Sequence, residues 1–195
     1  MSKLNWRKTA CAVLVLCAAT AIASPAQTFT TLFSFNGANG GGAYAGLIQA
    51  TDGNLYGTDE GGNDGNYGTV FRISPNGTLT TLYNFEENGP NGSNPYAALV
   101  QDTDGNFYGT TLLGGKPSSS CTGVDGCGTV FKITPSGALM TLHSFDQTDG
   151  YFPVAGLVQG TDGNLYGQRL LAGPTTTARR PPAAARCSRS ARAAP

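Results

Sequence analysis

The chain has 195 residues, enough for one medium-sized domain. Only 12% of them are charged and 28 are glycine, a composition that suits strands joined by tight turns and excludes a protein built of long helices. The net charge of zero hides three segments: a basic start over residues 1–26, an acidic middle over 27–167, and a tail over 168–195 with arginines and no acid. The acidic middle argues against a nucleic-acid partner.

Residues 1–26 are predicted to be a secretory signal peptide. A basic start precedes the apolar run Ala10–Ala19, and small residues follow, so cleavage is expected after Ala23 or Ala26. The apolar run is too short to span a bilayer, so an integral membrane protein is not expected. The protein is therefore predicted to be exported to the extracellular space or the cell surface, with the periplasm as the alternative.

Two sequence blocks recur through the middle of the chain. The first, of the form Ala-Gly-Leu-Val-Gln-x-Thr-Asp-Gly-Asn-x-Tyr-Gly-Thr, occupies residues 45–58, 97–110 and 155–167, the last copy lacking the final threonine. The second, of the form Gly-Thr-Val-Phe-x-Ile-x-Pro-x-Gly, begins stretches at residues 68–85 and 128–145. A repeat of about 50 residues is typical of arrays in which neighbouring units bury one another's faces.

Each repeat is predicted to form two β-hairpins. Gly46–Gln49 meets Leu55–Gly57 across Thr-Asp-Gly-Asn, and Thr69–Ile73 meets Leu79–Phe85 across Ser-Pro-Asn-Gly. Residues 28–35 match only the last strand of a repeat. Four strands per repeat predict an all-β fold, a β-propeller-like array of four-stranded repeats that is incomplete at about two and a half repeats, over residues 27–167. A β-solenoid is the alternative architecture.

Three cysteines lie beyond the predicted signal peptide. Cys121 and Cys127 sit in one Gly/Ser-rich insertion and are expected to form a disulfide in an oxidising compartment. A metal site there would need at least two further ligands, which the neighbouring sequence does not offer. Cys187 is left without a predicted partner.

The ordered combination of these blocks resembles the bacterial GloVer tandem repeat over about residues 28–167. The resemblance implies an exported "choice-of-anchor" protein of the cell surface, and it offers no catalytic residues to carry over. This chain departs from the pattern by having fewer than three full repeats and no recognisable anchor.

The tail over residues 168–195 breaks the repeat. After Tyr166-Gly167 the repeat predicts further Thr and Gly residues and then Gly-Thr-Val-Phe, but the chain becomes rich in Ala, Arg and Pro. We hypothesise a frameshift near codon 167, and a basic arm for anionic surfaces is the alternative. Either way the tail is expected to be disordered, because it is poor in residues that could form a core.

The repeated aspartates Asp52, Asp104 and Asp162 are weak candidates for calcium binding. Each is followed by Gly-Asn, so oxygen ligands are available, but a calcium loop takes six or more. A hairpin turn already explains the triplet. We therefore expect no metal and no cofactor.

Two kinds of aromatic position recur as well. Tyr56, Tyr108 and Tyr166 are candidates for an aromatic contact with sugars, although packing between repeats is favoured for them. His143 occupies the position of Phe33 and Tyr83, and a general base there would lack an orienting partner, so catalysis is not expected.

The sequence thus predicts a non-enzymatic repeat module for contact with a protein or a glycan. One alternative is a fragment of an extracellular propeller enzyme of the lyase or sugar dehydrogenase type. Another is a non-functional truncated product. Open sheet edges would also permit self-association.

Overall fold

A computed structural model describes residues 28–36, 41–61, 65, 67–116, 121, 126–146, 148–168 and, for the backbone alone, 187–190. The chain divides into two compact units, residues 1–31 and 32–195. The predicted signal peptide lies outside the described residues, and only residues 28–31 of the first unit lie within them. In the described part of the chain there is no helix with the length and apolar character that a membrane crossing requires.

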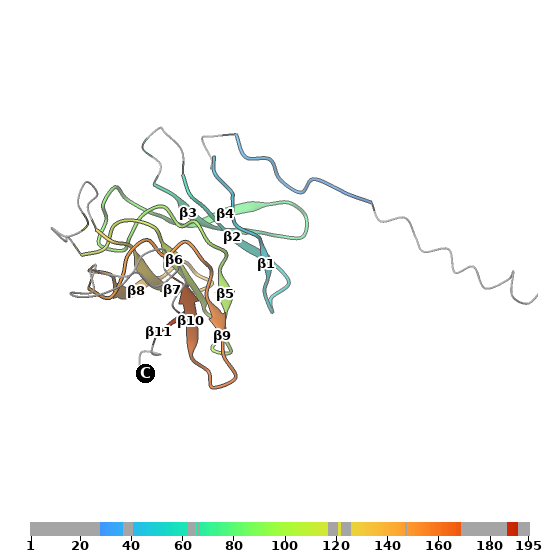
Figure 1. Cartoon of the computed structure of the whole chain (residues 1–195). Helices are drawn as coiled ribbons and strands as arrows, with labels where there is room; N and C mark the ends of the chain where they lie inside the picture. The colour runs from blue at the N-terminus through green and yellow to red at the C-terminus, as the bar shows by residue number, and fades with distance from the viewer. Residues whose placement is uncertain are drawn as a thin grey trace, which may run out of the picture. The chain divides into compact units, whose positions relative to one another are not determined.

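The described strands of the second unit form three antiparallel sheets, coloured along the chain in Figure 1. The first sheet contains β1 (Ile48–Gln49), β2 (Leu55–Asp59), β3 (Thr69–Ile73) and β4 (Leu79–Asn84) in chain order. The second repeats this order with β5 (Val100–Gln101), β6 (Phe107–Thr111), β7 (Thr129–Ile133) and β8 (Leu139–Ser144). The third contains β9 (Val158–Gln159), β10 (Leu165–Gln168) and β11 (Cys187–Ser190) in the order β11-β10-β9.

The predicted turns form because glycine supplies the positive φ that each turn needs. Between β1 and β2, the N–H of Gly53 donates to the Ala50 carbonyl at 2.9 Å, and Gly53 has φ 82°. Between β3 and β4, the N–H of Gly77 donates to the Ser74 carbonyl at 2.8 Å, and Gly77 has φ 86°. Such a turn closed by a left-handed glycine is a common hairpin connection. The Asp-Gly-Asn and Pro-x-Gly signals therefore predicted the two turns of each repeat correctly.

Inner strands of successive sheets pack through the tyrosine of the repeat. The ring of Tyr56 on β2 stacks on Phe107 of β6 with centroids 4.1 Å apart, and both residues are fully buried. Beside them the hydroxyl of Thr58 donates to the Ala97 carbonyl at 2.9 Å. Stacked aromatic rings bury a large apolar area, so this contact is a main part of the interface between the first two sheets.

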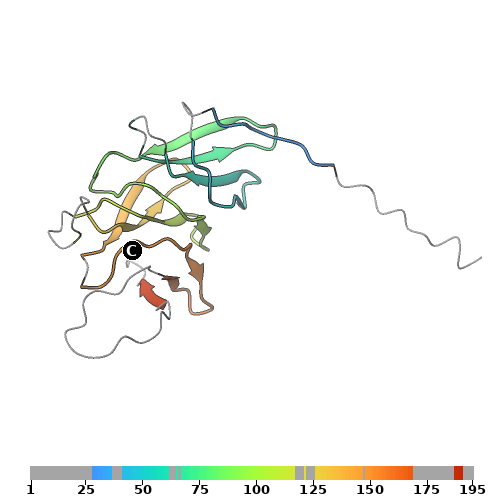
Figure 2. The same ribbon diagram turned by 45° about the horizontal axis from the view of Figure 1, so that its top comes forward.

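Outer strands interlock with the next sheet in the same way. Phe85, which follows β4, meets Phe131 of β7 edge to face at 5.5 Å. A Cβ on Gly137, in the β7–β8 turn, would lie only 2.5 Å from the Leu82 carbonyl oxygen of β4, so glycine lets this turn approach the preceding sheet. Figure 2 shows the sheets side by side as successive blades. The predicted propeller-like array is confirmed.

Residues 32–35 occupy the place of an outer strand before the first sheet. Phe35 meets Phe71 edge to face at 5.2 Å, and a Cβ on Gly77 would lie 2.6 Å from the Leu32 carbonyl oxygen. These contacts match those between the first and second sheets, as the sequence phase predicts. The segment is nevertheless not paired as a strand, because an outer strand pairs with the third strand of its own sheet and none of the described residues forms that strand for it.

The tail differs from its prediction at one point. Residues 187–190 form β11, which pairs with β10, whereas the whole tail is expected to be disordered. The physical reason lies in β10, whose outer edge presents backbone N–H and C=O groups that any extended segment can satisfy. The other residues of the tail after Gln168 lie outside the described part of the chain.

Candidate functional site

The Asp-Gly-Asn triplets build a rigid turn rather than an open ligand set. In the first repeat, the N–H of Asn54 donates to Asp52 Oδ1 at 3.0 Å and the Tyr56 hydroxyl donates to Asp52 Oδ2 at 2.8 Å. The second and third repeats reproduce both bonds, at 3.0 and 2.8 Å, around Asp104 and Asp162. Each carboxylate therefore accepts hydrogen bonds from its own turn and its own tyrosine. The chemistry of these contacts is that of a structural clamp.

Asp104 has a further partner in Lys132 on β7, whose ammonium lies 3.0 Å from Asp104 Oδ2. Burial acts to raise the pKa of Asp104, but hydrogen bonds from Asn106, Lys132 and Tyr108 outweigh it and hold that pKa well below its usual range. The pKa of Tyr108 is raised by burial and by its bond to the Asp104 carboxylate. At neutral pH Asp104 is therefore an ionised carboxylate paired with the Lys132 ammonium, and Tyr108 is neutral.

The recurring tyrosines do not form an exposed platform for sugars. Tyr56 is 0% exposed and Tyr108 is 3% exposed, because their rings lie between sheets and their hydroxyls reach the turn aspartates. Tyr166 is half-buried and makes the same bond to Asp162. For Tyr56 and Tyr108 the structure shows the packing between repeats that the sequence favoured.

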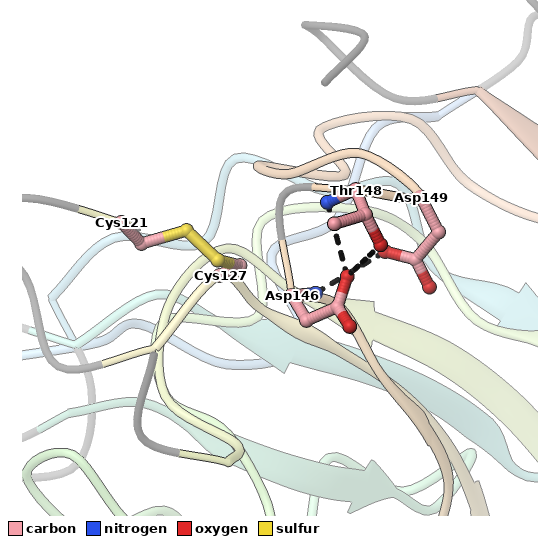
Figure 3. The surroundings of a disulfide bond; sticks show 5 residues. All are labelled: Cys121, Cys127, Asp146, Thr148 and Asp149. Atoms are coloured by element: carbon pink, nitrogen blue, oxygen red, sulfur yellow. Dashed lines mark hydrogen bonds between the residues drawn. A yellow bond between two sulfur atoms is a disulfide. The ribbon is translucent and has the colours of Figure 1, made fainter. Parts of the chain in front are cut away.

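The structure joins Cys121 and Cys127 by a disulfide, with their Cα atoms 5.7 Å apart (Figure 3). Both cysteines are buried. The Cys127 carbonyl accepts the N–H of Phe152 at 3.0 Å, so the disulfide loop is tied to the segment that leads into the third sheet. Its role in the described residues is to fasten one long loop.

His143 has a carboxylate partner that the sequence did not reveal. Its Nε2 lies 2.6 Å from Asp149 Oδ2, while its ring packs edge to face on Phe145 at 4.8 Å. The expectation that His143 lacks an orienting partner is therefore wrong. Asp149 also accepts the N–H of Asp146 at 3.1 Å, in the loop drawn in Figure 3, so the pair fastens this loop to β8.

The candidate binding feature is a pair of exposed tyrosines at equivalent positions of two repeats. Tyr44 precedes β1 and Tyr96 precedes β5, and their rings stack with centroids 5.4 Å apart and planes 24° apart. Tyr44 is 68% exposed and Tyr96 is 39% exposed. The two rings therefore expose aromatic surface to solvent and are not part of the buried core. The sequence contains a signal for this pair: Tyr44 and Tyr96 occupy the same position of two repeats, three residues before Leu47 and Leu99.

The backbone of one residue, Glu60, fixes both segments that carry the tyrosines. Its N–H donates to the Gly42 carbonyl at 3.0 Å, and its own carbonyl accepts the side-chain amide of Asn94 at 3.1 Å. The fully buried Asp59 accepts the N–H groups of Gly42 at 3.1 Å and Gly61 at 2.8 Å. The rings are thus held by a hydrogen-bonded frame before any ligand arrives, which lowers the entropy cost of binding.

The frame also brings the base of an acidic side chain, Glu60, near the Tyr44 ring. A Cβ on Gly42 would lie 3.1 Å from Tyr44 Cε2 and 3.4 Å from Glu60 Cβ, so the ring and the base of the Glu60 side chain flank the same glycine. Burial and the neighbouring Asp59 charge raise the pKa of Glu60. The described residues contain no group of three or more His, Cys, Asp or Glu side chains able to hold a metal ion. The site offers aromatic faces and a hydrogen-bond acceptor.

The four-stranded sheets repeat along the chain, pack on one another through aromatic rings, and carry an exposed tyrosine pair on their connecting segments. This arrangement is that of a propeller-like repeat protein. The family model of the Gloeobacter/Verrucomicrobia repeat matches residues 19–177, and the chain belongs to this family. No curated protein matches the chain.

Among solved structures, the chain is similar to a protein described as a putative gluconolactonase. The TM-score is 0.39 and the sequence identity 20%, with 63% of this chain and 40% of that protein covered. This chain therefore spans well under half of that protein's length.

Proposed function

We propose that this protein is a non-enzymatic binding module, exported to the cell surface or the medium, that contacts glycans through Tyr44 and Tyr96. The observation that carries the proposal is the exposed, stacked and preorganised pair formed by these two rings. Single exposed apolar residues are normal on protein surfaces, but two in register on successive repeats form a shared surface.

A pyranose ring suits this surface because one of its faces carries mostly C–H groups. Those groups pack on the face of a tyrosine, whose hydroxyl remains available for a hydrogen bond. We expect sugar hydroxyls to donate to the carboxylate of Glu60, whose Cβ flanks the same glycine as the Tyr44 ring. The acidic middle of the chain makes neutral glycans better partners than anionic ones.

Export rests on the N-terminal pattern of the sequence. Expression in a bacterial host followed by fractionation tests it, and the mature chain is expected to begin at Ser24 or Gln27. An uncleaved chain that stays in the cytoplasm contradicts the proposed location without touching the proposed site.

Affinity electrophoresis through gels that contain neutral soluble polysaccharides tests the glycan site. We expect Tyr44→Ala and Tyr96→Ala each to weaken retention about tenfold, the loss typical of an anchoring aromatic side chain. Tyr44→Phe keeps the ring and should retain most of the binding. Met140→Ala is the matched control, because Met140 is another half-exposed apolar residue but lies on β8.

Two outcomes would overturn the glycan site. In one, no neutral polysaccharide retards the wild-type protein. In the other, the Tyr44→Ala and Tyr96→Ala variants are retarded as strongly as wild type. Retention on a protein ligand together with no glycan binding would leave a binding module but reject its glycan partner.

A further inference from the structure

The first two sheets show which residues belong beside the second strand of a repeat. In the first sheet, Gly57 pairs with Phe71. In the second sheet, Gly109 pairs with Phe131. Phe71 and Phe131 are almost fully buried, at 1% and 0% exposure. A phenylalanine therefore stands opposite this glycine in both complete sheets.

The glycine is required because two side chains converge on it. A Cβ on Gly109 would lie 2.6 Å from Phe131 Cζ and 2.8 Å from Leu99 Cδ2. A Cβ on Gly57 would meet Phe71 at 2.7 Å and Leu47 at 2.6 Å. The space above the glycine is thus a socket, closed by a leucine from the same repeat and filled by the phenylalanine of the third strand.

The third sheet has half of this socket. Leu157 is in place, because its Cδ2 lies 2.7 Å from a Cβ built on Gly167. The strand beside Gly167 is β11, in the register of the other sheets, but Ser188 now stands opposite the glycine where Phe71 and Phe131 stand in the complete sheets. A serine cannot fill the volume of a phenylalanine ring.

The neighbouring position shows the same mismatch. Ser190 pairs with Leu165, whereas isoleucine pairs with the corresponding residues of the first two sheets. Residues of β6 are all buried, but in β10 only Leu165 is buried and Gln168 is exposed. The residues of β10 are therefore more exposed than their counterparts in β6, although β10 has formed a backbone ladder with β11.

We propose that the β10 edge is a docking site for a β-hairpin of the repeat's own type, supplied by another polypeptide. The fitting hairpin carries Gly-Thr-Val-Phe-(Arg/Lys)-Ile on its first strand and replaces β11. Its phenylalanine enters the socket formed by Gly167 and Leu157, against Phe145, as Phe131 does against Phe85. Backbone bonds to an exposed edge supply affinity in such strand addition, and the side-chain sockets supply specificity.

Competition with β11 sets the affinity. β11 has four residues, and its sequence has serine at the two register positions where the complete sheets have phenylalanine and isoleucine, so it offers backbone pairing without those apolar side chains. Its advantage is that it belongs to the same chain, which gives it a high effective concentration. Weakening β11 should therefore increase the affinity for a hairpin in trans.

A synthetic peptide with the sequence of residues 128–145, titrated into the full chain and followed by calorimetry, tests the proposal. We expect saturable 1:1 binding, weakened about tenfold or more when the peptide carries the change Phe131→Ser. Ser188→Pro in the chain should strengthen binding, because proline cannot sustain the β11 ladder. Ser136→Ala in the peptide is the matched control, since that position lies in the hairpin turn, and it should bind like the parent peptide.

The register provides an independent measurement. In a Gln168→Cys, Cys187→Ser variant of the chain, a peptide with Val130→Cys should form a disulfide, because the equivalent residues Thr110 and Val130 are paired in the second sheet. A peptide with Lys132→Cys should not. Three results would overturn the proposal. The first is that the parent and Phe131→Ser peptides bind equally well, and the second is that peptides with cysteine at 130 and at 132 crosslink equally. The third is that no peptide binds to the Ser188→Pro chain.

Discussion

The socket above Gly109 makes a quantitative prediction about stability. Gly109→Ala introduces a Cβ that would lie 2.6 Å from Phe131 Cζ and 2.8 Å from Leu99 Cδ2, both shorter than ordinary van der Waals contact. Phe131 is fully buried and Leu99 is 3% exposed, so neither side chain can move into solvent. Overpacking of this kind costs about 1–3 kcal/mol.

A smaller effect of opposite sign accompanies it. Replacing glycine by alanine restricts the unfolded chain and stabilises by about 0.4–1 kcal/mol where the native backbone accepts it. The net expectation for Gly109→Ala is a loss of about 1–2 kcal/mol in the free energy of unfolding. Urea unfolding followed by circular dichroism measures it, as a lower midpoint with an unchanged slope.

Gly46→Ala is the matched control. Gly46 lies in the same block of the repeat, but a Cβ there would meet no atom within 4 Å. This variant should be as stable as wild type or more stable by a few tenths of a kcal/mol up to about 1. If Gly109→Ala unfolds at the same urea concentration as Gly46→Ala, the packing of Phe131 and Leu99 on that glycine is refuted, and the docking proposal loses its template.

Four other outcomes are expected. The pKa of Asp104 is lower in the folded than in the unfolded protein, so the Asp104 carboxylate stabilises the fold above pH about 4, and this stabilisation is lost as the pH falls further. In urea unfolding, Asp104→Asn should therefore show a weaker dependence of stability on pH in this acidic range. Tyr56→Phe should cost about 1 kcal/mol in the same assay through the lost bond to the turn aspartate. Replacing Cys121 and Cys127 together by serine should cost about 2 kcal/mol, the entropy of closing so short a loop. Val154→Tyr places a third ring at the position of the third repeat that corresponds to Tyr44 and Tyr96, and it should increase retention on neutral polysaccharides. Unchanged retention would show that a further tyrosine at this position adds nothing to binding.

The parts of the fold that the sequence predicted are those that depend on short-range chemistry. Gly53 and Gly77 fix turns within four or five residues, and the pattern of Thr69–Ile73 fixes a strand whose bounds the structure reproduces. Recurrence of the same signals at a regular spacing then predicts equivalent sheets. No information about distant parts of the chain is needed for either step.

The parts that the sequence did not predict depend on how sheets and loops meet. Tyr44 and Tyr96 stack only because Glu60 ties both of their segments to one loop, and no local pattern contains that contact. Asp149 reaches His143 because the loop after β8 turns back, which the five intervening residues do not encode in an obvious way. Long-range contacts of this kind decide the site, while local ones decide the scaffold.

This division suggests where specificity can change without loss of the fold. Residues that recur at equivalent positions, such as Tyr56 and Tyr108, pack between sheets and bind the aspartates of their turns, so they are not available to a partner. Residues on the connecting segments differ between repeats, since Val154 stands where two tyrosines stand before it. Substitutions at the connecting segments alter the exposed surface but leave the stacked interior intact. A repeat protein built in this way can acquire a new partner by changing one side chain per repeat, because the hydrogen bonds that hold its segment come from backbone groups and from Asp59 and Asn94, not from that side chain.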